Sequence, residues 1–345
     1  MFHRDRGLWC RMGLAVLFWA IVLVQPADAA VSIEEISEGT FPACYRVSNA
    51  SVEVWVSRDF GPRILRYSLV GEENLFAERP DIVLKNEWGA YKLWGGHRIW
   101  TSPEATPLTF AGDDQPVTLT KRVSDEETVF QFVGSAHPQT RLQQEIHLAL
   151  EPEGTTARVR QLIRNVDDES KEIAVWALTI MAPGGRVFIP QPSRQGRLTP
   201  ARALVLWDYT DLSDPRWSFG KTWMQLRAED RFKGRQKIGL GNESGWLGYL
   251  KGKTIFTKVF PWSGRWEEYP DFGCNCEVYS DGGFVELESL SPRKTLAPGE
   301  AIAHEEVWPL LPDVDAGETE ESLSAALEDH LPRIEQEARN LISTY

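Results

Sequence analysis

The sequence predicts an all-β protein, a large antiparallel β-sandwich followed by a C-terminal amphipathic helix. Three observations support this fold class. Short segments of alternating apolar and polar residues recur from about residue 30 to residue 310, and clusters of Gly, Pro, Asp and Asn separate them. No helical periodicity of comparable length precedes residue 318. Antiparallel sheets with one buried face produce this pattern.

The first 29 residues are predicted to form a secretory signal peptide. Three arginines precede an apolar run at 12–24, and small residues follow it. This run is shorter than the about 20 residues that span a bilayer, which disfavours the alternative of an uncleaved anchor. We therefore expect a secreted, periplasmic protein with residues 30–345 as a single domain and no membrane contact after cleavage.

Individual strands are predicted where the side chains alternate with period two. The clearest are at 52–56, 129–133 and 159–163, which are rich in Val, Ile and Phe. Turns are predicted between strands at the sequences DFGP (59–62), APGG (182–185), SDGG (280–283) and APGE (297–300).

The C-terminal segment differs from the rest of the chain. From Leu323 to Leu341, apolar residues recur every three or four positions among acidic neighbours, which predicts an amphipathic helix over about 318–343. Pro332 interrupts the pattern, and we expect it to kink this helix.

The charge balance excludes one class of partner. The formal net charge is −13, and it becomes −14 without residues 1–29, because 34 basic residues then face 48 acidic ones. Such a chain is repelled by nucleic-acid phosphates and by anionic lipid. A neutral or cationic ligand is expected instead, and the sequence leaves the oligomeric state open.

Three cysteines remain after residue 29, an odd number for an oxidising compartment. Either Cys44 forms a disulfide with Cys274 or Cys276, or all three are buried thiols. One Cys-x-Cys pair offers too few ligands for zinc, and the run HEEVW at 304–308 does not place its side chains together. We expect no metal and no cofactor.

The run KLWGGHRIWTSPE (92–104) concentrates polar and aromatic side chains around a Gly pair. Glycines let other backbone segments approach closely, and the polar groups would be costly to bury without a partner. An indole beside charged groups suits a sugar site, because it stacks on pyranose C–H bonds while the charges bind hydroxyls. The candidate ligand-binding residues in this run are Trp94, His97, Arg98, Trp100 and Glu104.

Carboxylates gather in a second region. SDGG predicts a hairpin in which Glu286 and Glu288 share one strand face. Glu277 lies on the partner strand, near Asn275, where burial would raise its pKa. Trp207, within LWDYTDLSDPRW, is a further candidate for sugar contact.

Several segments together resemble the galactose mutarotase-like superfamily, in a bacterial branch. FGPRILRYSLVGEENLF (60–76) resembles the first hairpin of these proteins, and WGGHRIWTSPE is similar to a segment that lines a sugar pocket. LESLSPRKTLAPGE and AIAHEEVWPL resemble the strands that close the fold. The resemblance implies a large β-sandwich with a concave face that binds a pyranose.

In mutarotases a glutamate takes the anomeric proton while a histidine protonates the ring oxygen. The resemblance implies Glu288 as the base, with Glu277 as second choice, and Arg63 and Arg98 as ligands of hydroxyls or a carboxylate. The strand that carries His in the family has Thr179 and Met181 here. Either His97 supplies the acid, or this protein binds sugar without epimerising it.

Three functions therefore remain open. The first is an aldose 1-epimerase-like enzyme, and the second is a non-catalytic periplasmic carbohydrate-binding protein. The third is a polysaccharide hydrolase or lyase, because glycosidases use two carboxylates that flank the scissile bond. In each case the expected partner is a mono- or oligosaccharide.

Overall fold

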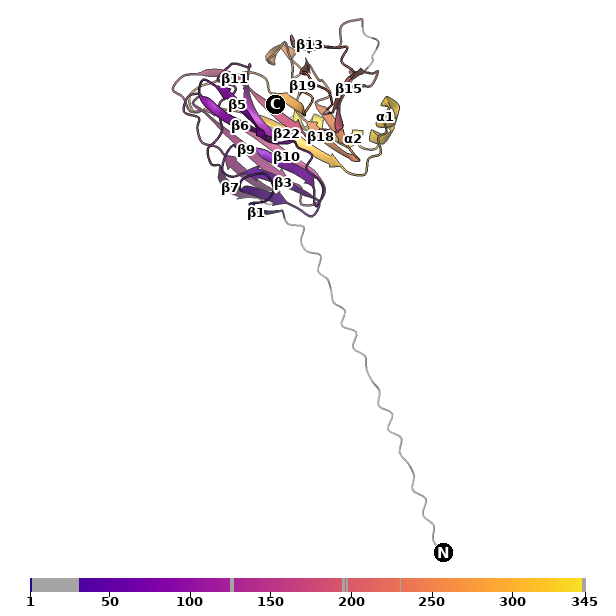
Figure 1. Ribbon diagram of the computed structural model, residues 1–345, viewed down its shortest axis with the longest axis horizontal. Coiled ribbons are helices and arrows are strands. Elements are labelled where there is room, and N and C mark those ends of the chain that lie inside the picture. The colour runs from indigo at the N-terminus through magenta and orange to yellow at the C-terminus, as the bar shows by residue number, and fades with distance from the viewer. Residues whose placement is uncertain (2–30, 125–126, 194–195, 197, 230, 343–345) are drawn as a thin grey trace.

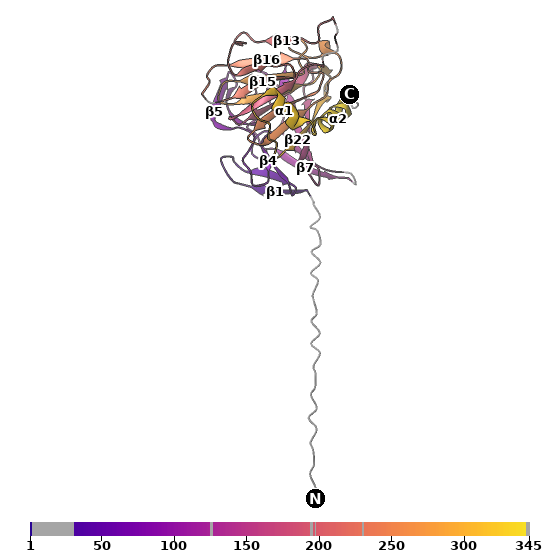
Figure 2. The same cartoon turned by 90° about the vertical axis from the view of Figure 1, so that its right-hand side faces the viewer.

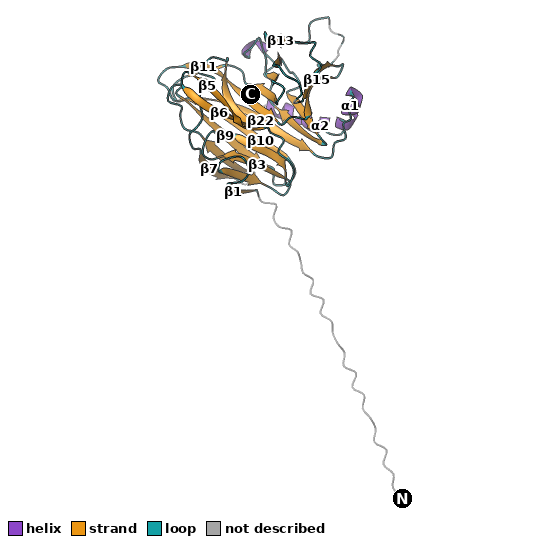
Figure 3. Cartoon of the chain, viewed as in Figure 1, coloured by secondary structure: helices purple, strands orange, loops and turns teal. Residues whose placement is uncertain are grey.

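The computed structural model describes Met1 and residues 31–342, apart from 125–126, 194–195, 197 and 230. The predicted signal peptide falls outside these residues except for Met1. Two large antiparallel sheets pack face to face, with little helix (Figures 1 and 3), so the predicted fold class is confirmed. None of the helices in the described residues has the length and apolar character to cross a membrane.

The first sheet has twelve strands, and its central five position most of the candidate residues. Along the sheet, the main path is β1 (Ser32–Ile36), β2 (Cys44–Ser48), β3 (Val52–Ser57), β4 (Ile64–Leu69), β6 (Gly89–Ser102), β11 (Lys171–Met181), β20 (Val285–Leu290), β19 (Cys276–Ser280), β16 (Gln236–Leu240) and β13 (Leu204–Leu206). Two further strands branch from this path, β5 (Glu78–Asn86) beside β6 and β21 (Lys294–Leu296) beside β11.

The second sheet has ten strands and packs behind the first. Its order is β14 (Trp217–Phe219), β15 (Trp223–Ala228), β12 (Gly185–Pro190), β17 (Trp246–Lys251), β18 (Thr254–Val259), β22 (Ala301–Leu311), β10 (Thr156–Asn165), β9 (Leu142–Leu150), β8 (Thr128–Val133) and β7 (Thr118–Val123). A short 3-10 helix, η1 (Trp266–Glu268), interrupts the loop after β18.

The main core lies between the sheets, because each strand turns alternate side chains inward. Val54 and Leu287 from the first sheet and Phe130, Ile146 and Leu310 from the second are all fully buried members of one cluster. The strands predicted at 52–56, 129–133 and 159–163 are β3, β8 and part of β10, and SDGG joins β19 to β20 as predicted.

The C-terminal segment forms two helices, so the expectation of one kinked helix is wrong. They are α1 (Glu320–Leu327) and α2 (Leu331–Ile342). Pro332 lies in the first turn of α2, where its missing N–H breaks no helical hydrogen bond. The chain therefore breaks before the proline rather than bending at it. Leu323 and Ile334 belong to one buried cluster with Trp246 of the second sheet, separate from the main core. Figure 2 shows α1 and α2 beside the strands of that sheet.

The Gly pair shapes β6. Trp94, Gly95 and Gly96 all have positive φ, at 60°, 86° and 69°. A Cβ on Gly95 would lie 1.9 Å from the carbonyl oxygen of Ala77, and one on Gly96 would lie 2.2 Å from that of Ile64. Only glycine fits here, and the bend lets one strand pair first with β5 and then with β4 and β11.

Candidate functional site

The register of five strands brings charged residues together on one face of the twelve-stranded sheet. Arg98 on β6 lies opposite Leu178 on β11, which lies opposite Glu288 on β20. Glu288 in turn lies opposite Glu277 on β19. Their neighbours along the strands, such as Leu287, point into the core. We call the face that carries Arg98, Glu288 and Glu277, turned away from the second sheet, the outer face.

Two carboxyl groups share one lysine on this face. Lys237 Nζ, from β16, lies 2.7 Å from Glu277 Oε2 and 2.9 Å from Glu288 Oε2. All three side chains are at least 95% buried. Trp176 Nε1 also donates to Glu288 Oε2, at 2.8 Å. We call Glu277, Glu288 and Lys237 the outer-face cluster.

The outer-face cluster is incompletely hydrogen-bonded. Glu288 Oε1 is buried and has no hydrogen-bond partner among the described residues. Glu277 forms an ion pair with Lys237, and its carboxyl group also lies close to those of Glu288 and Asp271. A buried carboxylate oxygen without a partner costs free energy, and such a group in a native protein calls for a bound ligand, water or catalytic role.

Burial and mutual repulsion set the protonation of these groups. Burial, together with the charge of Glu288, raises the pKa of Glu277 well above its usual range, although Lys237 opposes the shift. Burial also acts against the charged form of Lys237, but the two carboxylates hold its pKa well above the usual value. The cluster therefore combines a carboxyl group whose protonated form is favoured with a lysine whose charged form is favoured.

Glu286 adds a third carboxyl group to the outer face, two residues before Glu288 on β20. Burial, assisted by the charge of Glu288, raises the pKa of Glu286 to about 8. Perturbed carboxyl groups gathered in one place are typical of functional sites.

Aromatic rings enclose the lysine. Lys237 Nζ lies 4.5 Å from the ring centre of Trp176 and 4.5 Å from that of Trp207. Trp100 meets Trp176 edge to face at 5.6 Å, and the Arg98 guanidinium lies 4.5 Å from the ring centre of Trp100. Cations over indole faces are stabilised by the ring quadrupole, so the aromatic residues hold the charges in place.

Glu104 and Asp271 are the more solvent-exposed carboxyl groups near the cluster. Burial raises the pKa of each, and the charges of Lys237 and Glu288 act on both. Ser102 Oγ lies 3.4 Å from Asp271 Oδ2. These two side chains form the rim of the site on its solvent side.

His97 lies on the other face of the sheet, so the expectation that it shares a hollow with Glu288 is wrong. It lies opposite Thr179 in the register, and its Nδ1 is 2.9 Å from Thr179 Oγ1. Its Nε2 is 3.0 Å from Gln161 Nε2, on the second sheet. Successive residues of a strand point to opposite faces, so His97 and Arg98 are separated by the backbone of β6.

Three other candidates make contacts away from the outer-face cluster. Arg63 pairs with Asp113 through both Nε and Nη2. Trp94 stacks on Phe60 with ring centres 4.4 Å apart, and Asn275 accepts from the backbone N–H of Asn242 at 2.7 Å. The structure thus brings together Glu288, Glu277, Arg98, Trp100, Glu104 and Trp207, but not His97, Arg63, Trp94 or Asn275.

Sequence reasoning missed Lys237, Trp176 and Asp271. Lys237 had a usable signal, because it stands in the strand QKIGL next to the apolar or small residues Ile238, Gly239 and Leu240. A lysine in a buried strand needs a counter-charge, and that need points to a carboxylate on a neighbouring strand.

The cysteines are free thiols, so the alternative of a disulfide from Cys44 is wrong. All three are buried, and burial raises the pKa of Cys44 and of Cys276 to about 12. Among the described residues no three His, Cys, Asp or Glu side chains are placed to hold a metal ion.

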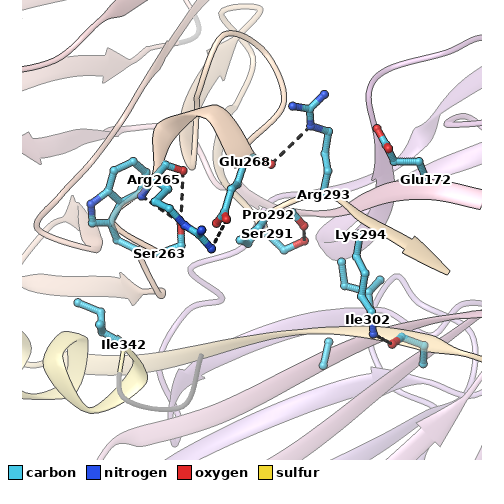
Figure 4. A pocket seen from close by; sticks show the side chains of 13 residues that line it. Glu172, Ser263, Arg265, Glu268, Ser291, Pro292, Arg293, Lys294, Ile302 and Ile342 are labelled. Carbon is cyan, nitrogen blue, oxygen red and sulfur yellow. Dashed lines mark hydrogen bonds and ion pairs between the residues drawn. The ribbon is translucent and has the colours of Figure 1, made fainter.

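A cavity of about 880 Å³ lies elsewhere, between β21, β22 and the loop around η1 (Figure 4). Its charged side chains are mostly exposed, and Arg265 pairs with Glu268 on its wall. Arg293 donates to the carbonyl oxygen of Glu267 at 2.9 Å. These groups are solvated or already partnered, so the chemistry points to the outer-face cluster rather than to this cavity.

The chain thus forms two large antiparallel sheets packed as a sandwich, with charged residues on the outer face of one sheet. No family model and no curated protein sequence matches the chain. Solved structures do match.

The chain is similar to a candidate aldose 1-epimerase from Klebsiella pneumoniae, with a TM-score of 0.57 and 13% identity over 90% of this chain and 87% of that one. It is also similar to a TPR-domain containing protein from Parabacteroides distasonis, with a TM-score of 0.53 and 13% identity over 82% of this chain. It spans about half (51%) of the latter's length. At these identities the likeness establishes the fold alone.

Proposed function

We propose that this chain is an exported, aldose 1-epimerase-like protein that binds a pyranose against the outer face of its twelve-stranded sheet. The observation that carries the proposal is the outer-face cluster, in which a protonated Glu277 and the unpartnered Glu288 Oε1 lie side by side. Opening a pyranose requires proton removal from the anomeric hydroxyl and proton delivery to the ring oxygen. Both oxygens are attached to the same carbon, so adjacent groups can serve both.

In this proposal Glu288 is the base and Glu277 is the acid. Lys237 and Trp176 bind Glu288 Oε2, which leaves Oε1 for the sugar hydroxyl. The raised pKa of Glu277 keeps a proton available near neutral pH. This assignment replaces His97, whose pKa burial lowers to about 3 and which lies behind the sheet.

The neighbouring groups fit a sugar. Trp207 and Trp100 offer aromatic faces at the edge of the cluster, and Glu104 and Asp271 can accept hydrogen bonds from hydroxyls. Glycosidic cleavage is less well supported, because Lys237 Nζ lies between the two carboxyl groups, where a scissile bond would have to lie. The leader-like segment at 1–29 supports export.

The test is the rate of anomer interconversion, followed by polarimetry with the purified protein and freshly dissolved D-glucose, D-galactose, D-mannose and D-xylose. We expect acceleration of at least one sugar. Glu288→Gln should lower the rate by about 10²- to 10⁴-fold, the usual range for loss of a general base. Glu53→Gln is the matched control. Glu53 is also buried on this sheet, but it lies on β3, away from the cluster, and pairs with Arg66.

A second candidate function is sugar binding without turnover. It is favoured by the near-complete burial of Glu277 and Glu288, which are 1% and 0% exposed. If calorimetry detects saccharide binding and no sugar of the panel changes its rate of mutarotation, this function replaces the first. If neither binding nor turnover is found, the carbohydrate proposal is overturned.

A further inference from the structure

An exposed aromatic pair borders the site on the loop that follows β18. Of the phenylalanines and tryptophans in the described residues, only Phe219, Trp266 and Phe272 are exposed. Trp266 and Phe272 are 63% and 84% exposed and lie on the same loop. Exposed aromatic side chains that gather in one place mark a binding surface more often than chance placement does.

The backbone conformation of this loop directs Phe272 toward solvent. Asp271 and Phe272 have φ of 51° and 60°, a conformation that costs free energy for residues other than glycine. The N–H groups of Gly273 and Cys274 both donate to the carbonyl oxygen of Pro270, at 3.0 Å. Phe272 is thus presented to solvent by a hydrogen-bonded turn.

Trp266 is fixed against the same turn. A Cβ on Gly273 would lie 3.1 Å from Trp266 Cβ and 2.9 Å from its carbonyl oxygen, so the indole packs directly on the glycine. Behind it, Trp262 and Tyr269 stack with ring centres 5.0 Å apart. Rigid aromatic side chains lose little conformational entropy on binding, which suits a preformed ligand surface.

A pocket of about 290 Å³ lies beside this pair, between Trp262, Trp266 and Phe272 and the segment 200–203. Its volume is near the lower limit for small-molecule sites, so it suits one sugar ring rather than a large ligand. Arg202 and Glu243 also line it and provide a donor and an acceptor. Aromatic walls with a few polar groups are what a saccharide site requires.

The pocket and the outer-face cluster are neighbours along the chain at two points. Asp271, at the rim of the cluster, is the residue before Phe272, and the pKa of its carboxyl responds to Lys237, Glu277 and Glu288. Gly241 lines the pocket, two residues beyond Gly239 of β16, which lies opposite Glu277.

We propose that the pocket beside Trp266 and Phe272 is a second sugar subsite, and that the ligand is a neutral pyranose chain of at least two rings rather than a free monosaccharide. This inference rests on the proposed function, since the first ring would occupy the outer-face cluster. A neutral chain is expected because carboxylates dominate that cluster and its rim. A protein partner would also use exposed aromatics, but the single-ring volume of the pocket and its position next to Asp271 in the chain favour a saccharide.

The experiment is calorimetric titration of the full chain with D-glucose, D-mannose and D-xylose and with their β-1,4-linked tetrasaccharides. At least one tetrasaccharide should bind about tenfold or more tightly than its monosaccharide. The double variant Trp266→Ala/Phe272→Ala should remove that gain, consistent with aromatic contacts of this size. It should leave monosaccharide affinity unchanged.

Phe219→Ala is the matched control, because Phe219 is exposed to 44% but lies on β14 of the other sheet, where it stacks on Trp217. Equal affinities for monosaccharide and tetrasaccharide would overturn the subsite and leave the proposed function intact. A complete lack of saccharide binding would overturn both. A change in sedimentation rather than in affinity on removing the aromatic pair would show a contact between proteins and also overturn the subsite.

Discussion

Two buried ion pairs lie on opposite sides of the twelve-stranded sheet, and they differ in how fully their carboxylates are hydrogen-bonded. The inner pair comes from β18 and β22 of the ten-stranded sheet and packs against the inner face of the twelve-stranded one. On the inner face, Lys258 Nζ lies 3.1 Å from Glu306 Oε1 and donates to the carbonyl oxygens of Ala177 and Leu287 and to Thr179 Oγ1. Both oxygens of Glu306 accept further hydrogen bonds, from Ser289, Gln161 and Trp308.

On the outer face, Glu288 Oε1 has no partner and Glu277 depends on one lysine. A buried ion pair whose carboxylate oxygens are both hydrogen-bonded stiffens a core, whereas one with an unmet carboxylate oxygen is poised to accept a ligand. The comparison teaches that burial of charge does not by itself identify the functional face. The unmet hydrogen-bonding capacity does.

The largest expected effect is a difference in stability between substitutions in the two ion pairs. Glu306→Ala leaves Lys258 buried without its counter-charge, and we expect the free energy of unfolding to fall by about 3–5 kcal/mol. Glu288→Gln keeps the shape of the side chain and leaves Lys237 paired with Glu277, so its loss should be about 1 kcal/mol. Urea unfolding followed by tryptophan fluorescence measures both, and equal losses would contradict the comparison.

The second effect is on the pH dependence of stability. On the outer face the folded pKa of Glu286, about 8, exceeds the ordinary 4.5, so the folded state holds this proton more tightly. The contribution of Glu286 to the free energy of unfolding is full below pH 4.5 and is lost as pH rises toward 8. Glu286→Gln should reduce the fall in the free energy of unfolding between pH 4.5 and 8 by about 1 kcal/mol or more, since one pKa unit corresponds to about 1.4 kcal/mol.

The buried histidines at the inner face give the opposite pH dependence of stability. Burial lowers the pKa of His97 to about 3 and that of His304 to about 4, both below the ordinary 6.5. Their contribution is present above pH 6.5 and is lost as pH falls toward 3. Unfolding measured from pH 4 to 9 should therefore show a maximum, and His304→Gln should weaken only the acid limb. A Glu286→Gln variant with an unchanged alkaline limb would contradict the assignment.

A third effect concerns His97. Replacement by Gln retains a donor and an acceptor for Thr179 and Gln161, so we expect a loss of about 1–3 kcal/mol in stability. The rate of mutarotation per folded molecule should not change, because the side chain lies behind the sheet. A stable His97→Gln protein without activity would restore His97 as the acid.

The fold was predictable because its signals are local. Alternation at 52–56 and the SDGG turn each specify a strand or hairpin from adjacent residues, and both are present as β3 and the β19–β20 connection. The C-terminal helix was predicted from its period, but the break at 328–330 depends on packing against the second sheet, which the period does not contain.

The site was predictable only in part. Glu286 and Glu288 on one face followed from alternation, and the same rule forbids His97 and Arg98 from facing one hollow. The Gly pair is untypical of a strand interior, so the sequence does not indicate that β6 continues through this segment. Lys237 and Asp271 join the site through strand order, β20–β19–β16, which arises from pairings far apart in the sequence.

The smallest effect tests the aromatic wall of the outer-face cluster. Trp207→Leu removes one of the two rings over Lys237 Nζ, and Trp176 still covers its other side. A cation over an indole contributes about 0.5–2 kcal/mol, so saccharide affinity should fall severalfold while the unfolding midpoint moves little. Trp88→Leu is the matched control, because Trp88 is also half-buried but contacts His137 away from the cluster. If both variants bind the saccharide equally well, Trp207 stabilises the lysine without touching the ligand, and the sugar is confined to the carboxyl side of the cluster.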